Sequence, residues 1–329
     1  MIYHWHQPQW RQLTAHWQNQ PNAWLFSGKA HTGKTAFARH LAQALLCENP
    51  AASHEPCGSC PSCHLFQQNS HPDFYELTPE IPEEEGSGRK LLQIKIDAVR
   101  SVIESIQLTS VRGGRRVVLV HPAESMNLQA ANGLLKVLEE PPADVEFLLV
   151  SHQRDKLLPT IKSRCRQLVL PAPAHAEALA YLEEQQLDDA ESLLAFHAGA
   201  PLFDPAPEQD EYRDALLQLL AEPRLLAILD YAADFDRQKS PLALFLDWLH
   251  KWLADVSLAH QNLSPLYYPA QLEAATQVAR KTNPATLFRL IETLNRISPY
   301  GRHTLNVRMQ VEYLLTEYLG FWQNKENTG

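Results

Sequence analysis

The sequence predicts an α/β fold in which a phosphate-loop domain with a parallel sheet is followed by an all-helical region. In "AWLFSGKAHTGKT" (23–35), a short apolar run leads into a glycine-rich loop that opens an amphipathic segment. The runs "RRVVLV" (115–120) and "VEFLLVS" (145–151) are equally short and apolar, as expected of buried strands. From about residue 208 onward the chain contains only segments with helical spacing of apolar residues.

Length and charge set the first limits. With 329 residues, the chain exceeds the roughly 250–300 residues that one hydrophobic core organises, so we expect two or three domains. Hydrophobic residues make up 45% and charged residues 20%, which is ordinary for a globular protein. The net charge of −9 argues against a generally basic DNA-coating surface, because DNA affinity depends on Lys and Arg. Contact with DNA should be local or made through partners.

The sequence predicts a cytoplasmic protein that does not enter a membrane. Apolar runs such as "VVLV" and "FLLV" are far too short to span a bilayer. The beginning "MIYHWHQPQW" lacks the basic start and apolar core of a secretory signal.

The glycine loop predicts a site for a nucleotide phosphate. It fits the phosphate-loop pattern through Gly28, Gly33, Lys34 and Thr35, and it stands between a strand and a helix, as the motif requires. Backbone N–H groups at the helix start would hold the anion, Lys34 would supply charge, and Thr35 would hold magnesium. ATP or ADP are the expected ligands.

Four clustered cysteines predict a structural Zn²⁺ site, since thiolates at Cys-x-x-Cys spacing can complete a tetrahedral shell: Cys47, Cys57, Cys60 and Cys63. Cys47 ends the predicted helix and is the preferred fourth ligand, although His54 or His64 could replace it. A reduced loop with incidental thiols and a redox pair are the alternatives. Cys165 stands alone and should pack as a small hydrophobic residue.

The segment between the cysteines and the next strand contains a loop, a helix and a turn. "PEIPEEEGSGRK" (79–90) is polar and acidic and should be a surface loop. Asp97 is the expected N-cap of a helix whose apolar residues Val99, Ile103 and Ile106 share one face. Arg112, Arg115 and Arg116 form a small basic cluster, for which a solvated turn is favoured over DNA contact.

The strand after that turn lacks the residues that hydrolysis needs. In a phosphate-loop ATPase it should end in acids that complete the magnesium shell and polarise the attacking water. Here His121 and Pro122 take those places, and Glu124 comes two residues too late to substitute simply. Neutral imidazole is a poor ligand for magnesium, and proline offers no base. Unless another carboxylate does this work, useful ATP hydrolysis is not expected.

The flanking sequence resembles the clamp-loader subunits of bacterial DNA polymerase III, and among them the delta-prime family. The resemblance rests on "ANGLLKVLEEPP" (131–142), "SRC" (163–165), and the cysteine knuckle followed by "HPD" (71–73). Together these motifs cover most of residues 20–170. The motor subunits of the family share them but keep the acidic pair that this chain replaces, which favours delta-prime.

The resemblance implies an AAA+ architecture with three parts. Residues 1–169 would form the nucleotide-binding-like domain with a zinc module at about 47–64, residues 170–206 a small helical lid, and residues 207–329 a helical collar for oligomerisation. In this family the arginine of the SRC motif, formed here by Ser163, Arg164 and Cys165, reaches the ATP site of the neighbouring subunit as an arginine finger. The motor's sensing arginine in the lid is replaced here by Leu202.

Other apolar residues are expected to be structural. Leu128, Ala131, Leu135 and Leu138 should line one face of the helix before Pro141. In the collar, Leu244, Trp248 and Leu253 should be core or interface residues, and "LNVRMQVEYLL" (305–315) resembles the last collar helix. The N-terminal tryptophans, Trp5, Trp10, Trp17 and Trp24, are also expected to pack rather than to mark a partner surface.

The predicted function is that of a non-motor, delta-prime-like clamp-loader subunit. It would assemble with the motor (gamma/tau) and delta subunits, load the sliding clamp on primer–template DNA, and supply Arg164 in trans. It would thus be a subunit of a DNA polymerase holoenzyme without useful ATPase activity of its own, although ATP or ADP could still bind. The alternatives are an active motor subunit and an unrelated zinc-containing nucleotide-binding module.

Overall fold

The computed structural model describes residues 2–79, 93–203, 207–298 and 306–323. These residues form two compact units. The first comprises residues 2–79, 93–178 and 200–202, and the second comprises the remaining described residues from 179 onward. The predicted boundaries at residues 169 and 206 stay a prediction. Most of the acidic segment 79–90 lies outside the described residues.

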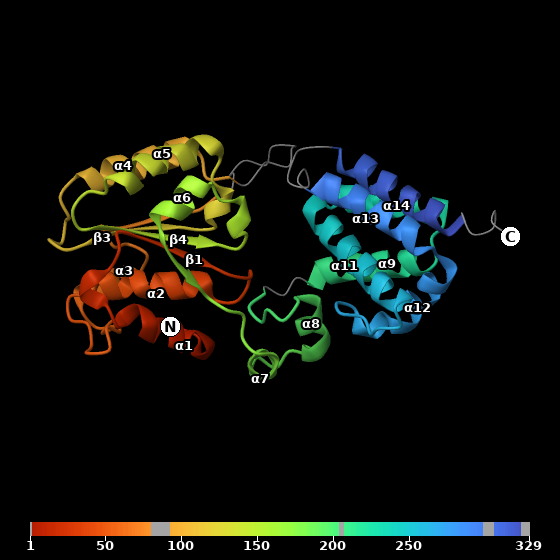
Figure 1. Ribbon diagram of the computed structural model, residues 1–329, viewed down its shortest axis with the longest axis horizontal. Helices are drawn as coiled ribbons and strands as arrows, with labels where there is room; N and C mark the ends of the chain where they lie inside the picture. Colours follow the sequence, from red (N-terminus) through yellow and green to blue (C-terminus); the bar gives the residue numbers. More distant parts are fainter. Residues whose placement is uncertain (1, 80–92, 204–206, 299–305, 324–329) are drawn as a thin grey trace. The chain divides into compact units, whose positions relative to one another are not determined.

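The first unit is built on a parallel sheet of five strands in the order β2-β3-β4-β1-β5 (Figure 1). The strands are β1 (Ala23–Ser27), β2 (Phe74–Leu77), β3 (Arg116–Val120), β4 (Val145–Ser151) and β5 (Arg166–Val169). β1, β3 and β4 are buried along their whole length. This explains their continuous apolar sequences, because helices cover both faces of the sheet.

Two helical layers enclose the sheet (Figure 1). One face carries α1 (Gln7–Thr14), α2 (Lys34–Leu46) and α3 (Pro61–Gln67); the other carries α4 (Ile96–Gln107), α5 (Leu128–Glu139) and α6 (Pro159–Arg164). β1 shows the alternation that this requires: Trp24 and Phe26 pack under α2, whereas Leu25 packs on the opposite side with Phe147. The predicted phosphate-loop sheet domain is confirmed.

Two details of the helices differ from expectation. α4 begins at Ile96 with Lys95 as its N-cap, so Asp97 lies in the first turn, where its charge suits the helix dipole. In α5, Leu128 is 64% exposed, because Asn127 caps the helix by accepting a 2.8 Å hydrogen bond from Ala130 and turns the first residue outward. The buried face of α5 is formed by Ala130, Ala131, Leu134 and Leu138.

The remaining helices begin at the edge of the sheet unit. α7 (His175–Glu184) spans the division between the two units, and the second unit is entirely helical: α8 (Ala190–Phe196), α9 (Pro207–Ala221), α10 (Leu225–Arg237), α11 (Leu242–His260), α12 (Leu272–Lys281), α13 (Pro284–Ile297) and α14 (Val307–Gln323). The predicted helical C-terminal region is confirmed. None of the helices in the described ranges has the length and apolar composition needed to cross a bilayer.

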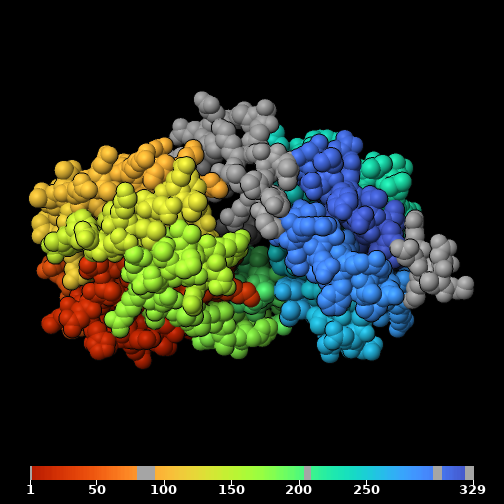
Figure 2. All heavy atoms as spheres, turned by 45° about the horizontal axis from the view of Figure 1, so that its top comes forward, coloured from red at the N-terminus to blue at the C-terminus, as the bar shows by residue number. Residues whose placement is uncertain are grey.

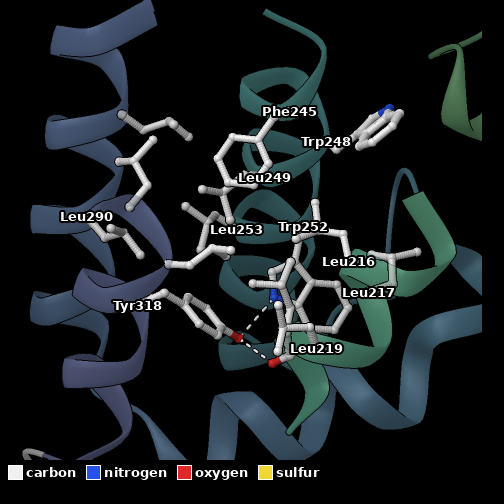
Figure 3. Packing of buried hydrophobic residues seen from close by; sticks show 14 of the residues in the cluster. Leu216, Leu217, Leu219, Phe245, Trp248, Leu249, Trp252, Leu253, Leu290 and Tyr318 are labelled. Atoms are coloured by element: carbon white, nitrogen blue, oxygen red, sulfur yellow. Dashed lines mark hydrogen bonds between the residues drawn. The ribbon is translucent and has the colours of Figure 1, made fainter. Parts of the chain in front are cut away.

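α11 forms the centre of this helical unit. Trp248 and Leu253 are buried there as predicted, and Leu244 is partly buried. Figure 3 shows the fully buried Tyr318 of α14 pointing between α11 and α9. Its hydroxyl accepts a 3.1 Å hydrogen bond from Trp252 Nε1 and donates a 2.8 Å hydrogen bond to the carbonyl of Leu220.

Candidate functional site

The glycine loop connects β1 to α2, and two of its glycines are required by the geometry. A Cβ on Gly28 would lie 2.2 Å from the carbonyl oxygen of Leu170, which is too close for any side chain. Gly33 is the N-cap of α2 and has a left-handed φ of 94°. Thr35 lies in the first turn of α2 and is partly buried. The four predicted loop residues therefore lie together at the N-terminus of one helix.

Lys34 is turned into its own loop. Its side chain is only 2% exposed, and its ammonium group donates a hydrogen bond to the carbonyl of Lys29. Burial lowers the pKa of Lys34 to about 8, and the negative charge of Glu124 opposes this shift. Lys34 is thus a partly desolvated cation whose opposite charge comes from within the chain.

Residues from both ends of the first unit cover the loop. Trp5 Nε1 donates a 3.0 Å hydrogen bond to the carbonyl of Thr32, and a Cβ on Gly33 would lie 2.5 Å from the ring of Tyr3. On the other side, the N–H of Leu202 donates a 3.0 Å hydrogen bond to the carbonyl of His31. Leu202, expected where the motors carry a sensing arginine, therefore packs on the phosphate loop.

The residue that follows β3, His121, is bound by a carboxylate from the neighbouring strand β2. His121 Nε2 lies 2.7 Å from Glu76 Oε1, and the guanidinium of Arg39 binds the same carboxylate at 2.6 Å. Burial alone would raise the pKa of Glu76, but the hydrogen bonds from His121 and Arg39 outweigh it and lower the pKa to about 2. This carboxylate is already engaged by Arg39 and His121, and Pro122 contributes no acid.

A second carboxylate, Glu124, lies in the site, and sequence reasoning had set it aside. It belongs to the short 3-10 turn Ala123–Ser125. Its Oε1 accepts a 3.0 Å hydrogen bond from the backbone N–H of His152. Its Oε2 is buried and has no hydrogen-bond donor among the described residues. In the sequence, the one sign of this role is that an acid lies close to the end of β3. The sequence does not show that the turn brings the Glu124 side chain to the end of β4.

The four predicted cysteines come together with the geometry of a metal centre. The Sγ atoms lie within 4.8 Å of one another, at separations that include 3.5 Å (Cys47 to Cys57), 3.9 Å (Cys47 to Cys60) and 4.0 Å (Cys57 to Cys63). Tetrahedral zinc with Zn–S bonds of about 2.3 Å places its sulfurs about 3.8 Å apart. The four cysteines can therefore hold one zinc ion.

Backbone hydrogen bonds favour the thiolate form of Cys57, whereas burial raises the pKa of Cys47 and Cys63. N–H groups of Cys57, Cys60 and Cys63 donate to Sγ atoms of the cluster at 3.3–3.4 Å. Backbone hydrogen bonds from Ser59 and Cys60 lower the pKa of Cys57 to about 6. Gly58 has a φ of 71°, as the tight turn requires.

Neither histidine considered as a fourth ligand lies in the cluster. His54 stacks on Trp17 with ring centroids 4.6 Å apart, and His64 is exposed on α3. Cys47 directly follows α2 as its C-cap and completes the set.

The HPD segment fastens this knuckle to the sheet unit. Ser62 Oγ donates a 2.5 Å hydrogen bond to the carbonyl of Leu46 and lies 2.7 Å from His71 Nε2. Asp73 accepts hydrogen bonds from the backbone N–H groups of Val111 and Arg112 at 2.9 and 3.1 Å. The segment thus joins α3, the end of α2 and the turn before β3.

The basic cluster is not a solvated turn throughout, which corrects the prediction. Arg112 and Arg115 pair with Glu48 and Glu146. Arg116 is buried, and its guanidinium donates to three backbone carbonyls: Ile106, Leu108 and Ala143. These carbonyls lie at the end of α4 and in the loop before β4, and the sequence did not indicate that they would need a donor.

Arg164 is the last residue of α6 and lies at the surface. Its Nη1 donates a 2.9 Å hydrogen bond to the carbonyl of Thr160, and its Nη2 pairs with Glu139, the last residue of α5. Figure 2 shows α5 in yellow and α6 in yellow-green lying together on this surface of the first unit. Ser163 is exposed, and Cys165 is buried in the sheet core with a pKa that burial raises to about 12.

Arg164 and the phosphate loop lie at opposite ends of the sheet. β5 runs parallel to β1 with Arg166 beside Trp24, so Arg164 precedes the amino ends of the strands. The loop follows Ser27, at the carboxyl ends. The five residues of β1 separate the two, which is about 16 Å of strand. Arg164 therefore cannot serve its own phosphate loop.

The sequence of the chain is similar to those of known proteins. The family model described as "DNA polymerase III, delta subunit" matches residues 5–174. The delta-prime subunit of DNA polymerase III from Pseudomonas aeruginosa is 40% identical over 258 residues, covering 76% of each chain. That from Escherichia coli is 31% identical and covers 96% of this chain and 94% of its own. A tau subunit from Salmonella typhimurium is 28% identical, over 91% of this chain and 50% of its own.

The phosphate loop, the cysteine knuckle and the SRC residues all lie within the matched region. The two delta-prime subunits are more identical to this chain than the tau subunit is, and the match spans 76% and 94% of their own length against 50% for the tau subunit. The chain belongs to the delta-prime subunit family of bacterial DNA polymerase III.

Proposed function

We propose that this chain is the non-motor subunit of a replicative clamp loader. It would assemble in the cytoplasm with motor (gamma/tau) and delta subunits, and the complex would place the sliding clamp on primer–template DNA. Family membership supports this proposal. The unrelated zinc-containing module is disfavoured for the same reason.

The observation that carries the mechanism is the position of Arg164 relative to its own phosphate loop. A surface arginine at the amino ends of the strands can act only on a site outside its own sheet unit. We propose that this site is the ATP site of the adjacent motor subunit. There, a planar guanidinium would stabilise the charge that develops on the transferred phosphoryl group.

The contacts of Arg164 would allow its side chain to leave Glu139 and bind a phosphate of the neighbouring subunit. Its pairing with Glu139 is partly exposed, with side-chain exposures of 31% and 51%. Pairs of this kind contribute about 0.2–1 kcal/mol. A trans-acting arginine finger is worth roughly 10³–10⁵ in rate. The ion pair can therefore be exchanged for a phosphate at little cost.

The chain itself would not hydrolyse ATP usefully. At the end of β3, His121 is held by Glu76 and Pro122 has no acid, so the usual magnesium and water-polarising groups are missing from these positions. Binding of ATP or ADP through Gly28, Gly33, Lys34 and Thr35 stays possible without turnover. Zn²⁺ on the four cysteines would be structural, stiffening the knuckle that connects α2 to α3.

ATP hydrolysis in the presence of clamp and primed DNA tests the proposal. The assay compares the chain alone, the motor subunits with the wild-type chain, and the motor subunits with the Arg164→Ala chain. We expect the chain alone to be silent and the Arg164→Ala assembly to lose at least 90% of the stimulated rate while still assembling. Arg164→Lys should not restore the rate, because lysine lacks the planar fork.

A neighbouring arginine provides the matched control. Arg166 is exposed two residues away and stacks on Trp24 at 5.2 Å. Arg166→Ala removes the same charge from the same edge of the sheet as Arg164→Ala. It should nevertheless leave most of the ATPase rate, because Arg166 is not the proposed finger. Turnover by the isolated chain that disappears on changing Lys34 would instead identify an active motor.

A further inference from the structure

A partly buried acid beside the phosphate loop has no role in the proposed trans action of Arg164. Glu124 is held by the N–H of His152, which directly follows β4. The last residue of β4, Ser151, pairs with Ser27, and Ser27 precedes the loop. The carboxylate is therefore fixed at the carboxyl ends of the central strands, beside the start of the loop.

The unpaired oxygen of Glu124 is shielded from solvent, so its charge acts strongly on nearby charged groups. Oε2 is buried and unpartnered among the described residues, and so is His152 Nδ1. Burial and the charge of Lys34 lower the pKa of His152 to about 4, so this histidine is neutral near pH 7. The charge of Glu124 acts on Lys34, which is almost completely buried. In such surroundings opposite charges are screened much less than at a surface.

Lys34 is also satisfied by its own loop rather than projecting from it. Its ammonium group binds the carbonyl of Lys29, and Thr32 Oγ1 donates to the same carbonyl at 2.9 Å. Above the loop, Gly33 is in contact with Tyr3 and Leu202. A nucleotide phosphate would have to displace these groups and share Lys34 with Glu124.

We propose that Glu124 is a built-in counter-ion of Lys34, which takes the electrostatic place of a nucleotide phosphate and keeps the affinity of this phosphate loop for nucleoside di- and triphosphates low. A phosphate adds negative charge beside the partly buried carboxylate of Glu124, and like charges in one site disfavour each other. The phosphate-loop motif is then intact in sequence, but the charge of its lysine is already compensated by Glu124. This inference rests on the proposed function only in treating the loop as a nucleotide site, and it does not involve Arg164.

Equilibrium binding of a fluorescent ADP analogue to the full chain tests the inference. Glu124→Gln keeps the acceptor for the His152 N–H and removes only the charge. We expect it to bind the analogue at least ten times more tightly than the wild type. Adding Lys34→Ala to Glu124→Gln should abolish the gain, because the freed cation is its source.

The matched control is Glu140→Gln, which removes one exposed acid at the end of α5. It should leave the affinity unchanged, so a general effect of net charge is distinguished from the local one. Glu124→Ala provides a second neutral variant if Glu124→Gln does not fold, as judged by circular dichroism and thermal melting. Equal or weaker binding by a folded neutral variant would overturn the inference.

The outcome is separable from that of the ATPase experiment. Weaker magnesium-dependent binding by Glu124→Gln, together with ATP turnover by the wild type, would assign Glu124 to the metal shell and overturn both proposals. Unchanged nucleotide binding by Glu124→Gln, together with an ATPase rate of the assembly that still depends on Arg164, would overturn the counter-ion inference and leave the proposed function standing.

Discussion

Removal of the Tyr318 hydroxyl tests how the helical unit is held together. Tyr318→Phe keeps the ring but leaves Trp252 Nε1–H and the carbonyl of Leu220 without this partner in a fully buried location (Figure 3). An unsatisfied buried donor or acceptor costs about 1–3 kcal/mol. Since Leu220 lies one residue before the end of α9, its carbonyl also lacks an intrahelical partner. We therefore expect a loss of about 2–4 kcal/mol.

Urea unfolding combined with hydrogen exchange detected by mass spectrometry measures this loss and localises it to peptides from α11 and α14. Exchange is needed because a chain with two units need not unfold in one step. Tyr313→Phe is the control, since Tyr313 lies on the same helix and is 44% exposed. If the two variants agree within about 0.5 kcal/mol, the Tyr318 bonds do not carry the stability assigned to them.

Two further predictions concern the knuckle and the strand end. Cys63→Ser should abolish stoichiometric zinc in the purified chain, whereas Cys165→Ser, whose thiol is isolated in the sheet core, should retain it; equal metal content in both would contradict the four-cysteine site. The pKa of Glu76 falls from 4.5 to about 2 on folding, so its contribution to stability is complete above about pH 4.5 and is lost as the pH falls toward 2. This shift corresponds to about 3 kcal/mol, or roughly 1–2 after allowing for partial exposure. Glu76→Gln should accordingly flatten the fall in unfolding free energy over this range, and an unchanged slope would refute the assignment.

Local patterns predicted the elements whose geometry is set by neighbouring residues in the chain. The strand, loop and helix around Gly28 and Lys34 follow from adjacent segments, and the cysteine spacing places three ligands within residues 57–63. Cys47 could be chosen over His54 and His64 because it ends a helix. In each case the constraint lies within about twenty residues of sequence.

Two of the wrong or missing predictions, those for Arg116 and Glu124, depended on distant partners. Arg116 is buried because carbonyls from two other segments need a donor, which no local pattern reveals. Glu124 lies near the phosphate loop because a short turn after β3 holds it against the end of β4. Leu128 is exposed although it fits the apolar spacing, since the cap places it in the first turn of α5. Periodicity describes a helix but not where the helix begins.

The arrangement of Arg164 and the phosphate loop at opposite ends of β1 makes the sheet unit directional. Its arginine-bearing surface differs from its loop-bearing surface, so a contact that joins an arginine to a loop is heterologous rather than isologous. Two such units joined in this way leave one arginine and one loop unmatched, and assembly continues head to tail until the rotation closes or a subunit without a complementary surface ends the series. If Arg164 acts in trans as proposed and the chain does not hydrolyse ATP, this subunit would suit such a terminal position.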